Sequence, residues 1–275
     1  MVETRRTFIA TLVSGFTLAT GPINAAAILT DADGLDAAEV SVPVSDGTIP
    51  AYRARRKDRK KAPVILVVHE IFGVHEYIKD ICRRFAKLGY YAIAPSLYAR
   101  YGDAGKYDMD HVQQLLSDIV GKTPDSEVMS DLDAAVGFAR SEGADASKLG
   151  ITGFCWGGRV VWLYAAHNPK VSAGVAWYGP LRGTPNALRP QTAIDLAPQI
   201  HAPVLGLYGA KDMGISAADI AAMRAALPGT TKSRIDVFDD AQHGFFADYR
   251  PSYNEQDAKI AWSRALEWFA ANGVR

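Results

Sequence analysis

Hydrophobic residues along the chain follow two patterns that alternate. Short runs that are apolar throughout are typical of strands buried on both faces of a sheet. Two further runs, 39–44 and 49–55, flank the turn residues 45–47 and predict an antiparallel hairpin. With this hairpin included, we expect strands at 39–44, 49–55, 64–68, 91–94, 149–154, 171–178, 204–208 and 234–238.

Between these strands, apolar residues recur three or four positions apart, which is typical of amphipathic helices. Strand and helix alternation after an initial hairpin predicts a doubly wound, mostly parallel sheet of about eight strands flanked by helices. We therefore expect a single α/β domain over residues 28–275, with its ligand site at the carboxyl ends of the strands. Helices are expected at 76–88, 112–119, 125–141, 159–167, 217–227 and 255–270.

The hydrophobic pattern loosens between residues 96 and 124, where tyrosines and glycines surround the short helical stretch. A long excursion of this kind in a compact domain is usually functional. We expect it to form a lid or a pocket wall.

Residues 1–27 differ in character from the rest of the chain. Arg5 and Arg6 precede a largely apolar stretch at 8–19 that is too short to span a bilayer, and a tract of small residues ends at Ala27. We interpret this segment as a signal peptide that resembles a twin-arginine export signal, with an N-terminal amphipathic helix as the alternative. Cleavage after Ala27 would leave a periplasmic or secreted protein.

Positive and negative charges balance in this chain. Lys and Arg together number 30, as do Asp and Glu, which offers no electrostatic basis for binding nucleic acid or an anionic membrane. The basic run at 55–61 lies between predicted strands and is interpreted as a solvated loop. Zinc-ligand spacings, a P-loop and a Gly-x-Gly-x-x-Gly motif are all missing from the sequence, so we expect no cofactor and no metal. We expect a monomer that acts on a small molecule, without a stable membrane anchor.

The candidate nucleophile is Cys155, which follows the predicted strand 149–154 in a Gly-x-Cys-x-Gly pattern. This pattern is the cysteine form of the nucleophile elbow, in which glycines let the backbones approach and the reactive side chain stands above the sheet. The alternative is a buried structural cysteine, which is what we expect of Cys82 on the apolar face of a predicted helix. Two cysteines do not form a disulfide framework.

Two further residues follow strand ends in the same predicted sheet. Asp212 comes after the seventh strand and His243 after the eighth, so the chain order is nucleophile, acid, histidine, as in the α/β-hydrolase fold. His243 could accept the proton of Cys155, and Asp212 could orient the imidazole. A surface histidine and a turn-forming aspartate are the alternatives, and His69 is the nearest competing histidine.

An oxyanion hole in this architecture would use the backbone N–H groups of Trp156 and Ile71. Glu70, at the end of the third strand, would be costly to bury unless it has a partner. Cys155 or an arginine could be that partner.

Several motifs together resemble the dienelactone hydrolase (carboxymethylenebutenolidase) family over nearly the whole chain after residue 27. That resemblance implies an α/β-hydrolase fold and a Cys-His-Asp hydrolase that opens an enol-lactone to an oxo-dicarboxylic acid. It also implies that Glu70 holds the resting thiol and helps to ionise it. The motifs lie at 69–73, 97–100, 153–158, Asp212 and 243–246.

Substrate recognition is where the sequence departs from the family pattern. The best-known members of the family bind the substrate carboxylate with two arginines, and Arg100 matches the first. Ala247 stands where the second would be, so either Arg250 replaces it or the substrate lacks that carboxylate. Tyr98 and Phe245 are expected in the pocket, although aromatic side chains can also belong to the core.

Two alternatives to a lactone hydrolase stay open at this point. One is a non-catalytic protein of the same fold that binds a small carbonyl compound. The other is a broader esterase with the same Cys-His-Asp site and a different pocket.

Overall fold

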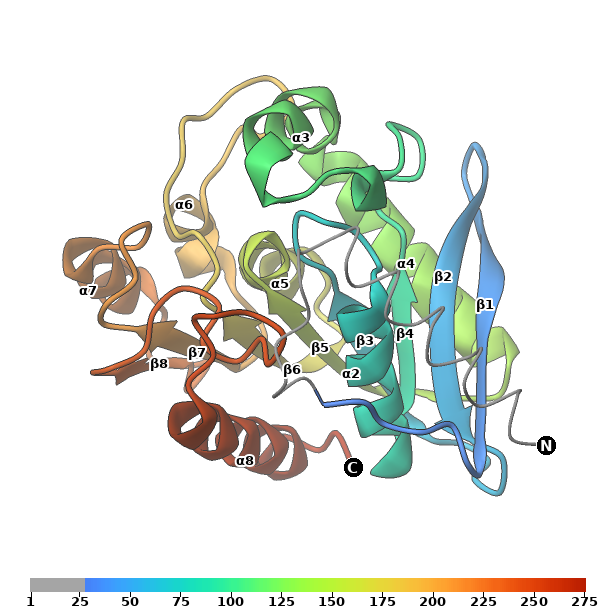
Figure 1. The fold of residues 1–275 in the computed structure, drawn as a ribbon. Helices are drawn as coiled ribbons and strands as arrows, with labels where there is room; N and C mark the ends of the chain where they lie inside the picture. Colours follow the sequence, from blue (N-terminus) through green and yellow to red (C-terminus); the bar gives the residue numbers. More distant parts are fainter. Residues whose placement is uncertain (1–27) are drawn as a thin grey trace.

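One sheet contains all eight strands that the structure describes (Figure 1). The structure is a computed structural model that describes residues 28–275, so the predicted signal peptide lies outside the described residues. The strand order is β1-β2-β4-β3-β5-β6-β7-β8; β1 and β2 run antiparallel to their neighbours, and all later pairs are parallel. The strands are β1 (Leu35–Val44), β2 (Gly47–Arg56), β3 (Pro63–Val68), β4 (Tyr91–Pro95), β5 (Asp145–Phe154), β6 (Val171–Trp177), β7 (Val204–Gly209) and β8 (Arg234–Phe238).

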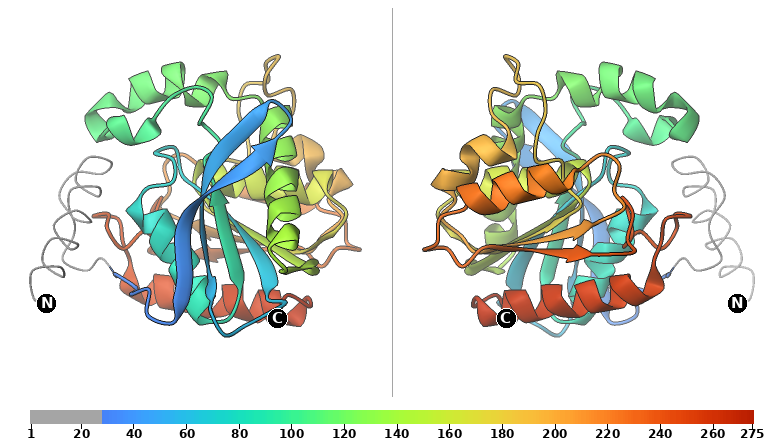
Figure 2. Two further views of the ribbon diagram at one scale, coloured as in Figure 1. Left: turned by 90° about the vertical axis from the view of Figure 1, so that its right-hand side faces the viewer. Right: turned by 90° about the vertical axis from the view of Figure 1, so that its left-hand side faces the viewer.

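Helices cover both faces of this sheet (Figure 2), with α2 and α8 on one face and α4, α5 and α7 on the other. The central strand β3 is buried along its whole length, as its uninterrupted apolar sequence predicts. The α/β-hydrolase fold class is therefore confirmed. The helices are α2 (Glu76–Lys87), α3 (Val112–Asp118), α4 (Asp125–Ser141), α5 (Trp156–His167), α6 (Ala193–Leu196), α7 (Ala217–Ala226) and α8 (Glu255–Ala271), with 3-10 turns η1 (Ala104–Lys106), η2 (Met109–His111), η3 (Val120–Lys122) and η4 (Ala197–Gln199).

The expected elements differ from the observed ones mainly in where they begin, and β1 starts at Leu35, four residues before its predicted start. Helix α5 begins at Trp156, three residues before the predicted start. The prediction treated Gly157 and Gly158 as part of the turn, whereas both lie in the first turn of the helix. Strand β5 begins at Asp145, where it pairs with Pro63 of β3 before its apolar part starts. The short helix α6 was not predicted.

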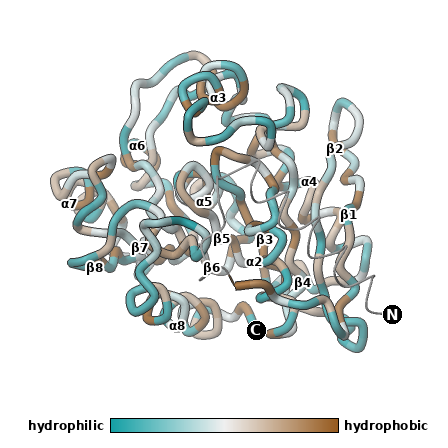
Figure 3. The backbone as a smooth tube through the Cα atoms, viewed as in Figure 1, coloured by the Kyte–Doolittle hydropathy of each residue, from teal (hydrophilic) through white to brown (hydrophobic). Residues whose placement is uncertain are grey.

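Two long segments lie above the carboxyl ends of the strands (Figure 1). One is the expected excursion at 96–124, which carries α3 and mixes hydrophobic with hydrophilic positions (Figure 3). The other runs from 178 to 192 between β6 and α6, and sequence reasoning did not single it out. Within residues 28–275, every helix is too short or too polar to cross a membrane.

Candidate active site

The turn between β5 and α5 is built from backbone contacts that leave no room for side chains. A Cβ atom at Gly157 would lie 2.5 Å from the carbonyl oxygen of Val68, and one at Gly158 would lie 2.4 Å from that of Trp177. A Cβ at Gly153 would lie 2.3 Å from the carbonyl oxygen of Gly157. The glycines of the motif are therefore required by close approach of neighbouring strands and the helix.

Cys155 stands on this turn in a strained backbone conformation. Its φ of 53° and ψ of −118° are unusual for a residue with a side chain, and its backbone N–H donates to the Trp177 carbonyl at 3.0 Å. Strain held by surrounding structure is common at functional sites. The residue is the N-cap of α5, where the positive end of the helix dipole favours a negatively charged sulfur.

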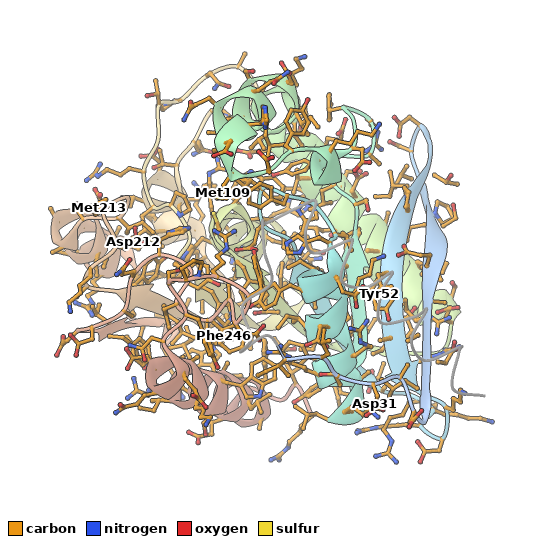
Figure 4. The ribbon with its side chains drawn as sticks, in the orientation of Figure 1. Asp31, Tyr52, Met109, Asp212, Met213 and Phe246 are labelled. Carbon is orange, nitrogen blue, oxygen red and sulfur yellow. The ribbon has the colours of Figure 1, made fainter. Side chains whose placement is uncertain are left out.

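His243 and Asp212 form a hydrogen-bonded pair at the ends of β8 and β7. Nδ1 of His243 donates to Oδ2 of Asp212 at 2.7 Å, and the other carboxylate oxygen accepts from the Gly214 N–H at 2.8 Å. Figure 4 labels Asp212 in the loop after β7, next to the fully exposed Met213. Asp212 itself is buried, and because it binds Nδ1, the opposite nitrogen Nε2 is the one that can interact with a nucleophile.

The electrostatics of His243 depend on both of its neighbours. Burial opposes its protonation, but hydrogen bonds to Asp212 and to Cys155 outweigh burial and raise the pKa of His243 to about 10. A raised histidine pKa next to a sulfur favours an imidazolium and thiolate pair.

A cavity of about 400 Å³ opens beside the cysteine. Ile71, Cys155 and Trp156 line it together, and Leu116 and Val120 contribute from the segment at 96–124. The N–H of Trp156 is the first of α5 and so has no acceptor within the helix. Both predicted oxyanion-hole residues thus lie at the cavity that holds the sulfur, and the excursion forms one wall.

Glu70 is fully buried next to this site and is held by three side chains. Its carboxylate accepts a short hydrogen bond from the Tyr249 hydroxyl, and it lies 3.3 Å from Nη2 of Arg250 and 3.5 Å from Nε2 of His75. Burial opposes ionisation of Glu70, but Arg250 and His75 lower its pKa to about 2. Of the two partners considered from the sequence, the structure pairs Glu70 with an arginine; a role in ionising Cys155 stays a prediction.

Known proteins resemble this chain over most of its length. A provisionally named carboxymethylenebutenolidase of Methylorubrum extorquens is 56% identical over 274 residues, which cover 98% of this chain and 94% of that one. One from Salmonella typhimurium is 50% identical over 262 residues, covering 94% and 96%. The crystal structure of a provisionally named dienelactone hydrolase from Klebsiella pneumoniae has a TM-score of 0.83 at 49% identity and covers 86% of this chain and 98% of that one.

Residues 49–273 match the model of the family described as the dienelactone hydrolase family. The chain belongs to the dienelactone hydrolase family. It is a hydrolase, in agreement with the resemblance found from its motifs. A dienelactone hydrolase-like phosphotriesterase from metagenomic libraries is only 21% identical at a TM-score of 0.71, so that likeness concerns the fold alone.

Arg100, the arginine that matches this family's pattern, lies in an ion-pair cluster. It forms two hydrogen bonds to Asp46 and two to Asp131, at 2.5 to 3.1 Å, and Glu127 lies 3.5 Å away. The prediction that Arg100 binds substrate is therefore corrected, because carboxylates of the protein already occupy its donors. It ties the β1–β2 hairpin to α4.

The two aromatic residues expected in the pocket have different outcomes. Phe245 has no exposed surface and packs against Trp177, Tyr178 and Phe238, so the structure places it in the core and contradicts a direct role in substrate binding. Tyr98 is also buried, but its hydroxyl has no hydrogen-bond partner among residues 28–275. It stays a candidate for contact with substrate.

Sequence reasoning missed the cavity wall contributed by residues 178–192. Arg182 and Arg189 come from this segment, and Arg159 comes from α5. The signal that could have found it is its length without regular structure, its prolines and its two glycines, and its two arginines. In residues 28–275, no group of three His, Cys, Asp or Glu side chains could hold a metal ion.

Proposed function

We propose that this dienelactone hydrolase family member is a cysteine-dependent hydrolase that opens small enol-lactones, or cleaves related activated esters, through a thioester on Cys155. One arrangement carries the proposal. Cys155 stands on a strained helix N-terminus, at the cavity, and interacts with a histidine that is bound to a buried aspartate. A non-catalytic binding protein would have no chemical need for that combination.

In the first half of the proposed reaction, the Cys155 thiolate attacks the lactone carbonyl. The N–H groups of Ile71 and Trp156 stabilise the oxyanion that forms. When the ring C–O bond breaks, the leaving oxygen departs as an enolate, which takes the proton of the His243 imidazolium and becomes a ketone, so that His243 is left as a neutral base. An enolate is a good leaving group that departs without prior protonation, whereas the nitrogen of an amide has to be protonated before it can leave.

In the second half, His243 takes a proton from water, and the resulting hydroxide attacks the thioester carbonyl. The C–S bond breaks, the acid is released and Cys155 returns as thiolate. Once the sulfur is acylated, its negative charge no longer raises the pKa of His243, so the imidazole loses its proton more easily. The same contact thus favours imidazolium before acylation and a neutral general base after it.

Replacing Cys155 with alanine tests the nucleophile. Cys155→Ala should lower kcat/KM for p-nitrophenyl acetate at least about a thousandfold, because no other side chain can form the acyl-enzyme. Cys82→Ala is the matched control, since Cys82 is fully buried in α2 and burial raises the pKa of its thiol. Equal rates for Cys155→Ala and the unmodified protein would refute a cysteine-dependent mechanism.

A substrate panel separates the lactone hydrolase from the broader esterase. The two share every residue of the Cys-His-Asp site, so only the ratio of kcat/KM values between an enol-lactone and open-chain esters of similar size distinguishes them. Preference for the lactone supports our proposal. Equal or greater kcat/KM for the open esters would favour the esterase.

A further inference from the structure

Three arginines lie at the cavity beside Cys155, and two of them are already paired. Arg159 forms a two-pronged ion pair with Asp125, with both hydrogen bonds at 2.7 Å. Arg182 donates to Asp219 at 2.5 Å and is largely exposed. Arg189 is different.

The guanidinium of Arg189 has one edge shielded from solvent and without a partner. Its Nε and Nη2 atoms have essentially no exposed surface, and neither has a hydrogen-bond acceptor among residues 28–275. Its own backbone is fixed, because the Arg189 N–H donates to the Asn186 side chain at 3.0 Å. Buried donors without acceptors are rare in folded proteins and usually indicate a missing ligand or water.

Two more buried donors near Arg189 have no partner in the described part of the chain. The hydroxyl of Tyr98, a residue only 2% exposed, is one, and Nε1 of Trp156, a residue 6% exposed, is the other. Their rings lie 4.8 Å apart. The Tyr98 hydroxyl interacts electrostatically with Arg189 and with Cys155, so it lies near both, although Tyr98 itself lines the neighbouring cavity next to His69.

The Nε and Nη2 atoms of an arginine lie on one edge of the guanidinium plane and match the two oxygens of a carboxylate. We propose that Arg189, assisted by the Tyr98 hydroxyl, binds a carboxylate on the acyl part of the substrate. This inference rests on the proposed function, because it assigns a substrate-binding residue of the same site. The new element is the residue and its place: the charge is recognised by Arg189 of the 178–192 segment, and not by Arg100.

No carboxylate among the described residues accepts a hydrogen bond from the Nε and Nη2 edge of Arg189. Asp125, the carboxylate that attracts Arg189 electrostatically, is occupied by Arg159. Burial and the positive charge of Arg159 lower the pKa of Arg189, and the negative charge of a bound anion would offset both effects. Arg100 cannot take this role while Asp46 and Asp131 hold its donors.

Two esters of similar acyl length test the assignment. Mono-p-nitrophenyl glutarate carries a carboxylate, and p-nitrophenyl valerate does not. We expect Arg189→Gln to lower the ratio of their kcat/KM values, anionic over neutral, roughly tenfold or more, chiefly through KM. Arg189→Lys should restore part of the ratio, because it keeps the charge without the two-pronged geometry.

Arg140→Gln is the control, since it removes the same charge from the exposed side of α4. An unchanged ratio in both Arg189→Gln and Arg189→Lys would overturn the assignment. So would an equal fall in Arg140→Gln. Tyr98→Phe should lower the ratio less than Arg189→Gln, because only a neutral donor is lost.

Binding of glutarate, measured by calorimetry, separates this inference from the proposed function. Glutarate should bind the unmodified protein and bind Arg189→Gln about tenfold more weakly, whether or not any ester is hydrolysed. If no ester is hydrolysed but this difference is present, the hydrolase proposal fails and the carboxylate site stands. If esters are hydrolysed and Arg189→Gln changes neither ratio nor binding, the carboxylate site fails and the hydrolase proposal stands.

Discussion

His243 lies between two groups whose charges raise its pKa, and only one of them changes during the proposed cycle. The Asp212 carboxylate contributes throughout, whereas the sulfur contributes only as thiolate. His243 is therefore protonated below its raised pKa. As pH rises through about 10, it loses its proton and the charge interaction of the imidazolium with Asp212 is lost.

Asp212→Asn tests this coupling through the pH profile. The neutral amide keeps the side-chain shape but removes the charge that favours imidazolium, so the alkaline limb of kcat/KM should move to lower pH. The maximum value of kcat/KM should fall roughly a hundredfold or more, because the imidazole is less well oriented. The measurement is kcat/KM from about pH 5 to about pH 11, corrected for spontaneous ester hydrolysis. An alkaline limb at the same pH in both proteins would show that Asp212 does not set the pKa of His243.

The turn from β5 into α5 is the element on which the site depends. Its sequence pattern predicted the position of Cys155 correctly but placed the helix start too late. Glycines normally discourage helix, and here two of them lie in the first turn because backbone atoms of β3 and β6 pass within van der Waals distance. Pattern reasoning cannot distinguish that cause from a flexible loop, because the contact partners are far away in the chain.

Gly158→Ala should destabilise the protein and lower activity together. The new methyl group would lie 2.4 Å from the Trp177 carbonyl oxygen and 2.9 Å from the Gly179 Cα, and backbone atoms cannot rotate away as a side chain could. We expect a loss of roughly 1–3 kcal/mol, measured by urea unfolding. Gly137→Ala in the middle of α4 is the control, because nothing lies within 4 Å of its Cβ position. There alanine should be neutral or stabilising by up to about 1 kcal/mol; similar losses in both variants would contradict this account.

At the scale of the whole molecule, the strands along the chain, the mostly parallel sheet and the edge at which the site forms could be predicted from the sequence, whereas the order of the strands within the sheet was not predicted. Buried strands can be recognised from apolar runs in the sequence, and the carboxyl ends of parallel strands necessarily share an edge of the sheet. The sequence contains no comparable pattern that identifies which side chains pair with one another. Arg100 matched a motif yet pairs with α4, and Glu70 pairs with Arg250. Arg189, whose guanidinium edge has no partner among the described residues, comes from the irregular segment 178–192, where local sequence constrains conformation least.

Export is the remaining prediction for the whole molecule. The described chain begins at Ile28, whose backbone N–H donates to Asp248 at 3.3 Å and whose carbonyl accepts from Arg84 at 3.4 Å, so removal of residues 1–27 would leave the new terminus attached to the fold. We expect the full-length chain, expressed in a bacterium with twin-arginine export, to be recovered from the periplasm with Ile28 as its first residue, as mass spectrometry would show. Replacing Arg5 and Arg6 together with lysine keeps the positive charge but removes the twin-arginine pattern, so the chain should then stay uncleaved in the cytoplasm. Cleavage of both forms alike would indicate a general signal peptide, and absence of cleavage in the unmodified chain would show that residues 1–27 are not a signal peptide.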